Sequence, residues 1–140
     1  MKAFLDTSVL VAALSARHPH HIASLDLLRS FKRNDVCCGT HSLAELYSTL
    51  TGKLRAAPNE ALLALSDVRD RLTIISLSDQ EYFKVIEASA GLALAGGAIY
   101  DAILGHCALK GKAAVIYTWN TKDFLRLGTA ISSRVKTPAT

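Results

Sequence analysis

The sequence predicts an α/β fold in which a mostly parallel sheet of four to five strands lies between two layers of helices. Short apolar segments alternate along the chain with longer segments whose apolar residues recur at helical spacing. Such alternation is typical of parallel sheets that are covered by helices on both faces. The chain has 140 residues, of which 50% are hydrophobic, so we expect one domain over residues 1–140 with one well-filled interior.

The first strand is expected at residues 2–6, an apolar run that ends in Asp6. A short helix follows and is begun by Thr7 or Ser8, because residues of this type favour the start of a helix. A second helix is expected at residues 20–33, where apolar residues recur at helical spacing. The apolar stripe of that helix consists of Ile22, Leu25, Leu27, Leu28 and Phe31.

The second strand is expected at residues 36–39. The helix after it begins at Thr40 or Ser42 and ends at Gly52, since glycine commonly terminates helices. Pro58 begins the next helix, because proline is tolerated in the first helical turn. The apolar sides of these two helices are expected to carry Leu43, Leu46, Tyr47 and Leu50, and Leu62, Leu63, Leu65 and Val68.

The third strand is expected at the β-branched segment 72–76. Ser78 and Glu81 have the spacing of a capping box, which predicts that the next helix begins there. A further helix is expected at about residues 100–110, followed by a fourth strand at residues 113–117. The remaining expectations are a loop or short helical turn at residues 119–124 and a short edge strand at residues 131–135.

Composition narrows the classes of partner and compartment. A net charge of +4 makes the protein moderately basic, which favours a polyanionic partner without identifying one. Three cysteines, Cys37, Cys38 and Cys107, are an odd number with an adjacent pair, so we expect buried thiols in a reducing cytoplasm. No uncharged run is long enough for a membrane span, and Asp6 interrupts the apolar start, so we expect neither a membrane helix nor a signal peptide.

Four acidic residues carry the main functional signal: Asp6, Glu45, Asp101 and Asp123. Each has an ordinary structural explanation, since Asp6 and Asp101 suit helix starts, Glu45 is three residues after Ser42 as in a capping box, and Asp123 lies in a polar segment. In the expected fold, however, all four reach one edge of the sheet. Clustered carboxylates repel one another unless a cation compensates them, and Mg²⁺ or Mn²⁺ prefers oxygen ligands.

The segments around these acids resemble the motifs of PIN domains, and more closely those of the ribonuclease toxins of VapBC toxin–antitoxin pairs. The resemblance covers nearly the whole chain, including its length and the order of its elements. The segments that carry it are Leu5-Asp6-Thr7-Ser8, the isolated Glu45, Ile99-Tyr100-Asp101-Ala102-Ile103-Leu104 and Thr118-Trp119-Asn120-Thr121-Lys122-Asp123-Phe124.

The resemblance implies a Mg²⁺- or Mn²⁺-dependent endoribonuclease that hydrolyses RNA phosphodiesters and leaves a 5′-phosphate and a 3′-hydroxyl. It implies that Asp6, Asp101 and Asp123 coordinate the metal, with Glu45 as a water-mediated ligand or as the group that orients the attacking water. Asn120 is one departure, because many family members carry Asp there. That departure leaves Asp123 as the fourth acid.

The resemblance also implies a small antitoxin protein as partner and a homodimer. Residues expected to hold the carboxylates and metal-bound waters in place are Thr7, Ser8, Thr118 and Asn120. Candidates for contact with RNA phosphates are Lys53, Arg55, Lys122 and Arg126.

The same residues also suggest other functions, which the sequence favours less. A phosphatase of the haloacid dehalogenase type needs a second Asp two residues after the first, where this chain has Ser8. His18, His20 and His21 suggest zinc, but no further Cys or His stands at ligand spacing. Tyr100 and Trp119 are expected as interior or groove-wall residues, with stacking on bases as the alternative. A catalytically inactive PIN-like RNA- or protein-binding module stays open.

Overall fold

The computed structural model describes residues 2–139 and contains a five-stranded sheet in which every pairing is parallel. The strand order is β3-β2-β1-β4-β5, so the first strand lies at the centre. The chain builds outward from β1 to β3 and then returns to place β4 on the other side of β1. The strands are β1 (Ala3–Leu5), β2 (Val36–Gly39), β3 (Thr73–Ile75), β4 (Val115–Tyr117) and β5 (Val135–Lys136).

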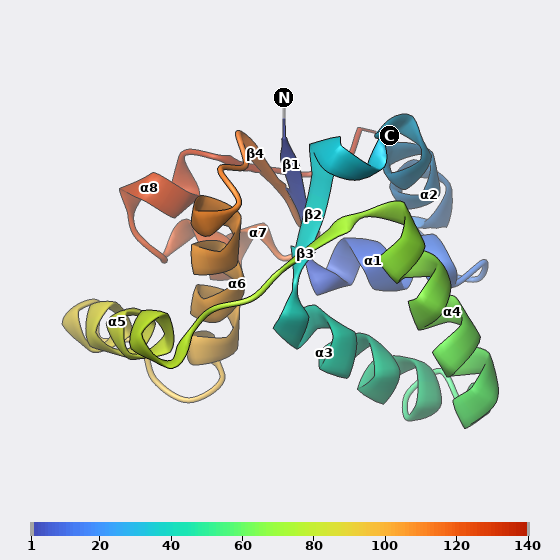
Figure 1. The fold of residues 1–140 in the computed structure, drawn as a ribbon, viewed down its shortest axis with the longest axis horizontal. Coiled ribbons are helices and arrows are strands. Elements are labelled where there is room, and N and C mark those ends of the chain that lie inside the picture. The colour runs from blue at the N-terminus through green and yellow to red at the C-terminus, as the bar shows by residue number, and fades with distance from the viewer. Residues whose placement is uncertain (1, 140) are drawn as a thin grey trace.

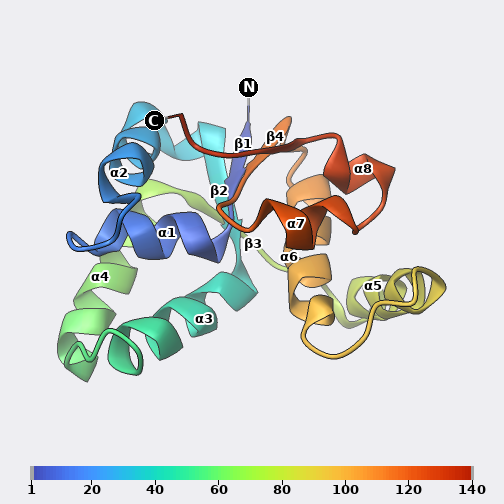
Figure 2. The ribbon, with the colours of Figure 1, turned by 180° about the vertical axis from the view of Figure 1, so that it is seen from behind.

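Helices cover both faces of the sheet, which confirms the predicted three-layer α/β/α arrangement. Figures 1 and 2 show α1 to α4 on one face and α5 to α8 on the other. The helices are α1 (Thr7–Leu14), α2 (His21–Ser30), α3 (Thr40–Thr51), α4 (Pro58–Arg71), α5 (Asp79–Gly91), α6 (Ala98–Lys110), α7 (Thr121–Leu125) and α8 (Thr129–Ser132), with a 3₁₀ turn η1 (Arg33–Asp35).

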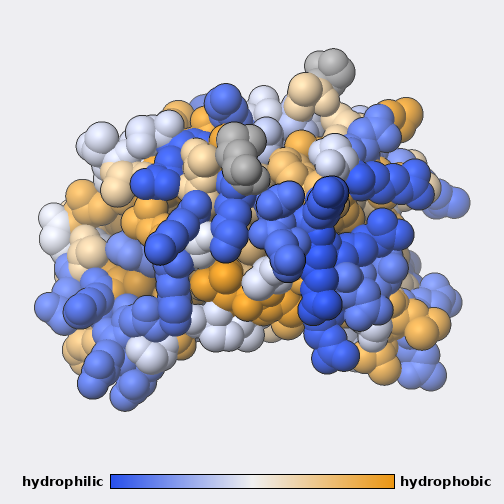
Figure 3. Space-filling view, turned by 45° about the horizontal axis from the view of Figure 1, so that its top comes forward, coloured by the Kyte–Doolittle hydropathy of each residue, from blue (hydrophilic) through white to orange (hydrophobic). Residues whose placement is uncertain are grey.

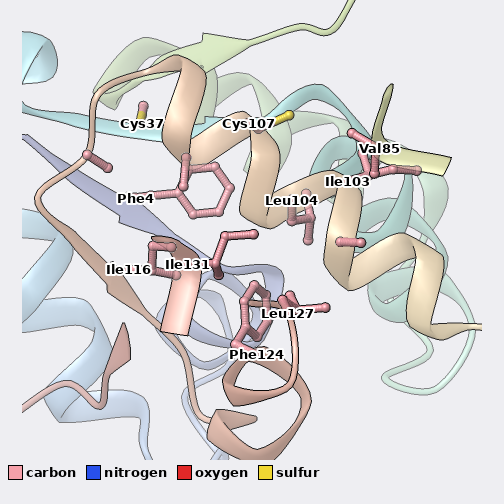
Figure 4. Close-up of a cluster of buried hydrophobic side chains, with 13 residues drawn as sticks. Phe4, Cys37, Val85, Ile103, Leu104, Cys107, Ile116, Phe124, Leu127 and Ile131 are labelled. Carbon is pink, nitrogen blue, oxygen red and sulfur yellow. The ribbon is translucent and has the colours of Figure 1, made fainter. Parts of the chain in front are cut away.

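The interior consists of two apolar clusters, one on each side of the sheet. Successive side chains of a strand point to opposite faces, so Phe4 packs into one cluster and Leu5 into the other. Figure 4 shows the first cluster, in which Phe4 and Ile116 from the strands meet Leu104, Phe124 and Ile131 from the helices. The second cluster contains Leu5, Val9, Leu10, Leu46 and Val68.

The cysteines are small buried side chains, as expected. Cys37 and Cys38 belong to opposite clusters, and Cys37, Cys38 and Cys107 are all buried free thiols. Burial raises the pKa of Cys37 to about 11 and that of Cys38 to about 12, so both thiols stay protonated at neutral pH. Within residues 2–139, no helix is long and apolar enough to cross a membrane.

Most predicted elements are present, and the capping box is confirmed. The Ser78 N–H donates to Glu81 Oε1 at 2.8 Å, and the Glu81 N–H donates to Ser78 Oγ at 3.2 Å. The predicted helix at residues 20–33 is too long, because α2 ends at Ser30 and η1 follows.

Burial on the outer helices differs from the predicted stripes. Ile22 is 75% exposed, Leu62 is 58% exposed and Leu63 is 71% exposed. On α4 the buried residues are Ala61 and Val68, because this helix lies at the outside of its layer and packs on α3. Leu62 and Leu63 therefore form part of the surface, although the periodicity predicted that they would share the buried side of the helix with Val68.

The predicted edge strand at residues 131–135 is only partly correct. Ile131 belongs to α8 and is buried in the first cluster, while β5 begins at Val135. Gly128 has φ of +95°, a backbone conformation that side chains other than glycine rarely adopt, and it lets the chain turn into α8. The turn carries the side chain of Ile131 against Gly105 of α6.

Candidate active site

The site begins where the strand order switches, at the carboxyl ends of β1 and β4. Asp6 directly follows β1 and Thr118 directly follows β4. The Thr118 hydroxyl donates to Asp6 Oδ2 at 2.8 Å, and the Asp6 N–H donates to the Tyr117 carbonyl at 3.0 Å. Open α/β sheets bind ligands at such a switch point. Asp6 therefore lies where the sequence placed it, buried with 3% of its surface exposed.

Two hydroxyl groups fix the orientation of the Asp6 carboxylate. Ser8 Oγ donates to Oδ2 at 2.8 Å and accepts from the Trp119 N–H at 3.0 Å. Thr118 Oγ1 donates to the same oxygen and accepts from the Asn120 N–H at 2.9 Å. Both side-chain hydrogen bonds reach Oδ2, so Oδ1 has no side-chain partner among the described residues. Asp6 occupies the N-cap position of α1 but makes no side-chain capping hydrogen bond, so capping does not explain it.

Burial sets the electrostatics of Asp6. It raises the pKa of this carboxyl above its ordinary value, and the hydrogen bonds from Thr118 and Ser8 oppose that shift. A cation next to Oδ1 would further favour the charged form.

Glu45 is held by α1 rather than by a capping box. The helix begins at Thr40 with Gly39 as N-cap, so Ser42 lies inside the first turn and the capping-box explanation is wrong. Thr7 Oγ1 lies 3.0 Å from Glu45 Oε1 and 3.0 Å from Ser42 Oγ. Thr7, which directly follows Asp6, therefore connects the start of α1 to Glu45 on α3.

The pKa of Glu45 is raised, chiefly by burial and further by the charge of Asp6. The hydrogen bond from Thr7 and the nearby His41, whose Nε2 lies 3.9 Å from Oε1, oppose this shift.

The pKa of Asp101 is raised by burial and by the charges of neighbouring acids. It lies in the first turn of α6, where Figure 1 places the helix start below the carboxyl ends of the strands. Burial raises the pKa of Asp101 to about 6, and the negative charges of Asp6, Asp123 and Glu45 contribute in that order. Arg126 lowers it only in part. The four acids are therefore close enough to act on one another electrostatically.

Asp123 lies at the margin of this group. Its Oδ1 is 3.7 Å from Arg126 Nη2, about half of its side chain is exposed, and it does not line the central cleft. Asn120 lines that cleft instead. The structure thus brings Asp6, Glu45 and Asp101 to one cleft, and it places Asp123 at the margin of that cleft, where its charge still raises the pKa of Asp101.

The cleft has a volume of about 330 Å³ and contains residues that the sequence did not select. His18 lines it, with Nδ1 accepting from the His20 N–H at 3.0 Å. In the sequence, His18 was noted only as part of the histidine cluster around Pro19, which suggested a zinc site. The cleft is lined by Asp6, Thr7, Ser8, Val11, His18, Glu45, Thr49, Lys53, Asp101, Trp119 and Asn120. Of the predicted phosphate contacts, Lys53 is in this set and Arg55, Lys122 and Arg126 are not.

Trp119 forms one wall of the cleft, as expected. Its ring stacks on His20 with centroids 3.7 Å apart and planes 10° apart. Its indole N–H donates to Ser24 Oγ at 2.9 Å, and Ser24 is fully buried. These contacts hold the Trp119 ring in place, and His20 covers one of its two faces, so an RNA base could not stack on that face.

The donor set fits a magnesium-type ion that keeps part of its water shell. Among residues 2–139, no three Asp, Glu, His or Cys side chains are placed to hold one ion together. Mg²⁺ retains several waters and is usually bound through one or two carboxylates. Asp6 and Asp101 would be the direct ligands of such an ion, and Glu45 would reach it through water.

Comparisons with known proteins identify the family and the fold. Residues 3–129 match the family model described as PIN domain. No curated protein sequence matches the chain. Several experimental structures share the fold at low sequence identity.

The VapC20 toxin of Mycobacterium tuberculosis, described as cleaving the sarcin–ricin loop, has 18% identity and a TM-score of 0.70 over 87% of this chain and 92% of that one. A toxin–antitoxin complex from Klebsiella pneumoniae has 22% identity and a TM-score of 0.69 over 99% of this chain and 98% of that one. VapBC2 from Rickettsia felis, bound to a promoter DNA fragment, has 21% identity and a TM-score of 0.68 over 98% of each chain.

Proposed function

Since the chain belongs to the PIN domain family, we propose that it is a Mg²⁺- or Mn²⁺-dependent endoribonuclease that hydrolyses RNA phosphodiesters. The observation that carries this proposal is that Asp6, Glu45 and Asp101 line one cleft at the carboxyl ends of the central strands. Burial, and then the charges of the other acids, raise the pKa of Asp101 there to about 6. Lys53 is the one basic Lys or Arg side chain in the lining of this cleft, so three acids there leave an excess of negative charge that a divalent ion would compensate. A bound ion would also attract RNA phosphates to the cleft.

A bound ion would lower the pKa of a coordinated water and neutralise charge on the scissile phosphate. Asp6, fixed by Ser8 and Thr118, offers Oδ1 as a ligand, and Asp101 offers its carboxylate from the opposite helix. Glu45, held by Thr7, orients the attacking water, and its raised pKa suits a group that accepts a proton.

The products of cleavage test this mechanism. Purified protein incubated with RNA should cleave only with added Mg²⁺ or Mn²⁺ and should leave a 5′-phosphate and a 3′-hydroxyl. A 2′,3′-cyclic phosphate product, or full activity in excess EDTA, would contradict it. Mapping of RNA cleavage in cells after induction, with Asp6→Asn as control, would identify the RNA target.

We further propose that the enzyme is the toxin of a toxin–antitoxin pair. The similar structures include toxin–antitoxin complexes, which supports a small antitoxin protein as partner. We propose the cytoplasm as the place of action, because Cys37, Cys38 and Cys107 are free thiols. Exposed apolar side chains support contact with protein, and hydrophobic patches interrupt the hydrophilic surface in Figure 3. Leu62 and Leu63 on α4, and Phe83 and Ile86 on α5, are candidates for the antitoxin interface and for a homodimer. Co-purification and sedimentation would test the two assemblies.

One observation favours a second candidate, a PIN-like module that binds RNA or protein without cleaving RNA. Asn120 occupies the cleft where many family members carry Asp, and Asp123 stays outside. Such a module would bind no divalent ion at the cleft. Calorimetric titration with Mn²⁺ separates the two candidates.

A further inference from the structure

Two aromatic rings stack beside the acidic cleft. His41 is the second residue of α3 and Tyr100 is the third residue of α6, so the two helix starts meet through these side chains. Their ring centroids are 5.0 Å apart and their planes differ by 6°. Tyr100 is nevertheless 50% exposed, although large aromatic side chains usually bury most of their surface. The stacked arrangement therefore holds an aromatic side chain open to solvent.

The two rings line a cavity that continues into the acidic cleft. The cavity has a volume of about 390 Å³ and is lined by His41, Ala44, Glu45, Ser48, Thr49 and Tyr100. Glu45 and Thr49 also line the acidic cleft. A strand of RNA whose phosphate reaches Asp6 and Asp101 thus has a cavity with aromatic walls directly beside it.

We infer that His41 and Tyr100, here called the stacking pair, receive an unpaired RNA base next to the scissile phosphate. This inference rests on the proposed ribonuclease function and adds to it a position that binds one base of the substrate. Every base has a π-face that stacks on an aromatic ring, and such stacking is tolerant of sequence. A base in a duplex is covered by its neighbours, so only splayed bases of loops or single strands reach such a surface.

The chemistry of the two pockets differs in a way that suits one nucleotide. The acidic cleft offers carboxylates, hydroxyls and Lys53 to a cation and a phosphate. The cavity of the stacking pair offers ring faces, the methyl of Ala44 and the hydroxyl of Ser48 to a base. Trp119 and Tyr100 each have one ring face covered, by His20 and His41 respectively. Tyr100 is exposed and Trp119 is only partly exposed, so Tyr100 is the more accessible stacking residue.

The experiment combines substitution of Tyr100 with removal of the base that it would contact. A randomised pool of single-stranded RNA first identifies a cleaved sequence, which is then synthesised with an abasic nucleotide at each position beside the cut. On the intact RNA, Tyr100→Leu should lower kcat/KM about 5- to 100-fold, the range expected for loss of one base–aromatic stack. On the RNA that lacks the stacked base, wild type and Tyr100→Leu should cleave equally well. Tyr100→Phe, which keeps the ring, should match wild type on both RNAs.

Tyr47→Leu on α3 is the matched control, because it removes another exposed tyrosine ring, lies outside both pockets and should leave cleavage unchanged. If Tyr100→Leu cleaves intact RNA as fast as wild type, or loses the same factor on every abasic RNA, the stacking pair has no such role and the ribonuclease proposal stands. If wild-type protein cleaves none of the pool with Mg²⁺ or Mn²⁺, the ribonuclease proposal falls and this inference falls with it.

Discussion

The Thr118 hydroxyl donates a 2.8 Å hydrogen bond to the Asp6 carboxylate, across a sequence separation of 112 residues. This contact joins the carboxyl ends of β1 and β4, the two neighbouring strands between which the strand order reverses. Burial raises the pKa of Asp6, and this hydrogen bond acts in the opposite direction. The charge of the proposed metal ligand therefore depends on a hydroxyl that reaches it from the other end of the chain.

Removal of the Thr118 hydroxyl should lower metal affinity and activity without leaving a cavity in the interior. In Thr118→Val the shape is kept but the donor to Asp6 is lost, so we expect cleavage activity or Mn²⁺ affinity to fall about 10- to 100-fold. Thr118→Ser keeps the donor and should lose much less. The comparison is made by kcat/KM for RNA and by calorimetric Mn²⁺ titration. Equal activity of the valine and serine variants would show that the hydrogen bond has no part in catalysis.

Asp101 should destabilise the metal-free protein at neutral pH. Its pKa in the fold is raised to about 6 from an ordinary value of 3.8, so the folded state binds its proton more tightly than the unfolded chain. Stability from this group is fully present below about pH 4 and is lost as pH rises through about 6. After a discount for partial exposure, Asp101→Asn should stabilise the metal-free protein at pH 7 by about 1 kcal/mol, or roughly 3–5 °C in Tm.

The pH dependence of the gain in stability shows whether it comes from removal of the Asp101 charge or from another effect of the Asp101→Asn substitution. Differential scanning calorimetry in EDTA should show the gain of Asp101→Asn at pH 7 and almost none at pH 4. A gain of the same size at both pH values would mean that repulsion among the acids is not its cause. Added Mn²⁺ should raise the Tm of wild type and leave that of the variant nearly unchanged.

Asn120 offers a substitution that should strengthen the site. Because Asn120 lines the cleft, Asn120→Asp adds a carboxylate there, and we expect roughly tenfold tighter Mn²⁺ binding, or about 1.4 kcal/mol. Metal-free Asn120→Asp should be less stable than wild type, since a further negative charge faces Asp101. The matched control is Asp123→Asn, which should weaken Mn²⁺ binding less than Asp101→Asn does, since Asp123 lies outside the cleft next to Arg126. Unchanged affinity in Asn120→Asp would place the ion elsewhere.

Lys53 should contact an RNA phosphate. It lines the cleft beside the acids, so Lys53→Gln should weaken binding of single-stranded RNA and lower the slope of log affinity against log salt by about 0.7. Lys112→Gln is the control, because Lys112 precedes β4 and so lies toward the opposite edge of the sheet. Filter binding in EDTA over a range of salt concentrations gives both slopes. The same slope in wild type and Lys53→Gln would remove this residue from the RNA path.

Local signals in the sequence predicted the elements that depend on local chemistry. The capping box of Ser78 and Glu81 forms as its spacing indicates, and the second strand has the bounds that its apolar residues predict. Periodicity was less informative for burial, because it indicates which residues share a helix face and not whether another element covers that face. Leu62 and Leu63 are exposed for this reason.

The sequence predicted the acidic residues of the site but not the contacts that hold them in place. Asp6, Glu45 and Asp101 line one cleft as expected, but Glu45 is held by Thr7 and not by the capping box that its spacing suggests. His18 could not be selected, because it follows α1 in a turn and no pattern relates a turn residue to a distant cleft. The stacking of His41 on Tyr100 likewise depends on how α3 meets α6, a tertiary relationship that leaves no mark on either segment.

Calorimetric titration of the metal-free protein with Mn²⁺, carried out in parallel on wild type and Asp101→Asn, tests the proposed metal site most directly. We expect saturable binding to wild type and its loss in the variant, because the ion relieves a repulsion that is centred on Asp101. Identical heats from the two proteins, or no heat from wild type, would contradict a catalytic cation between these carboxylates.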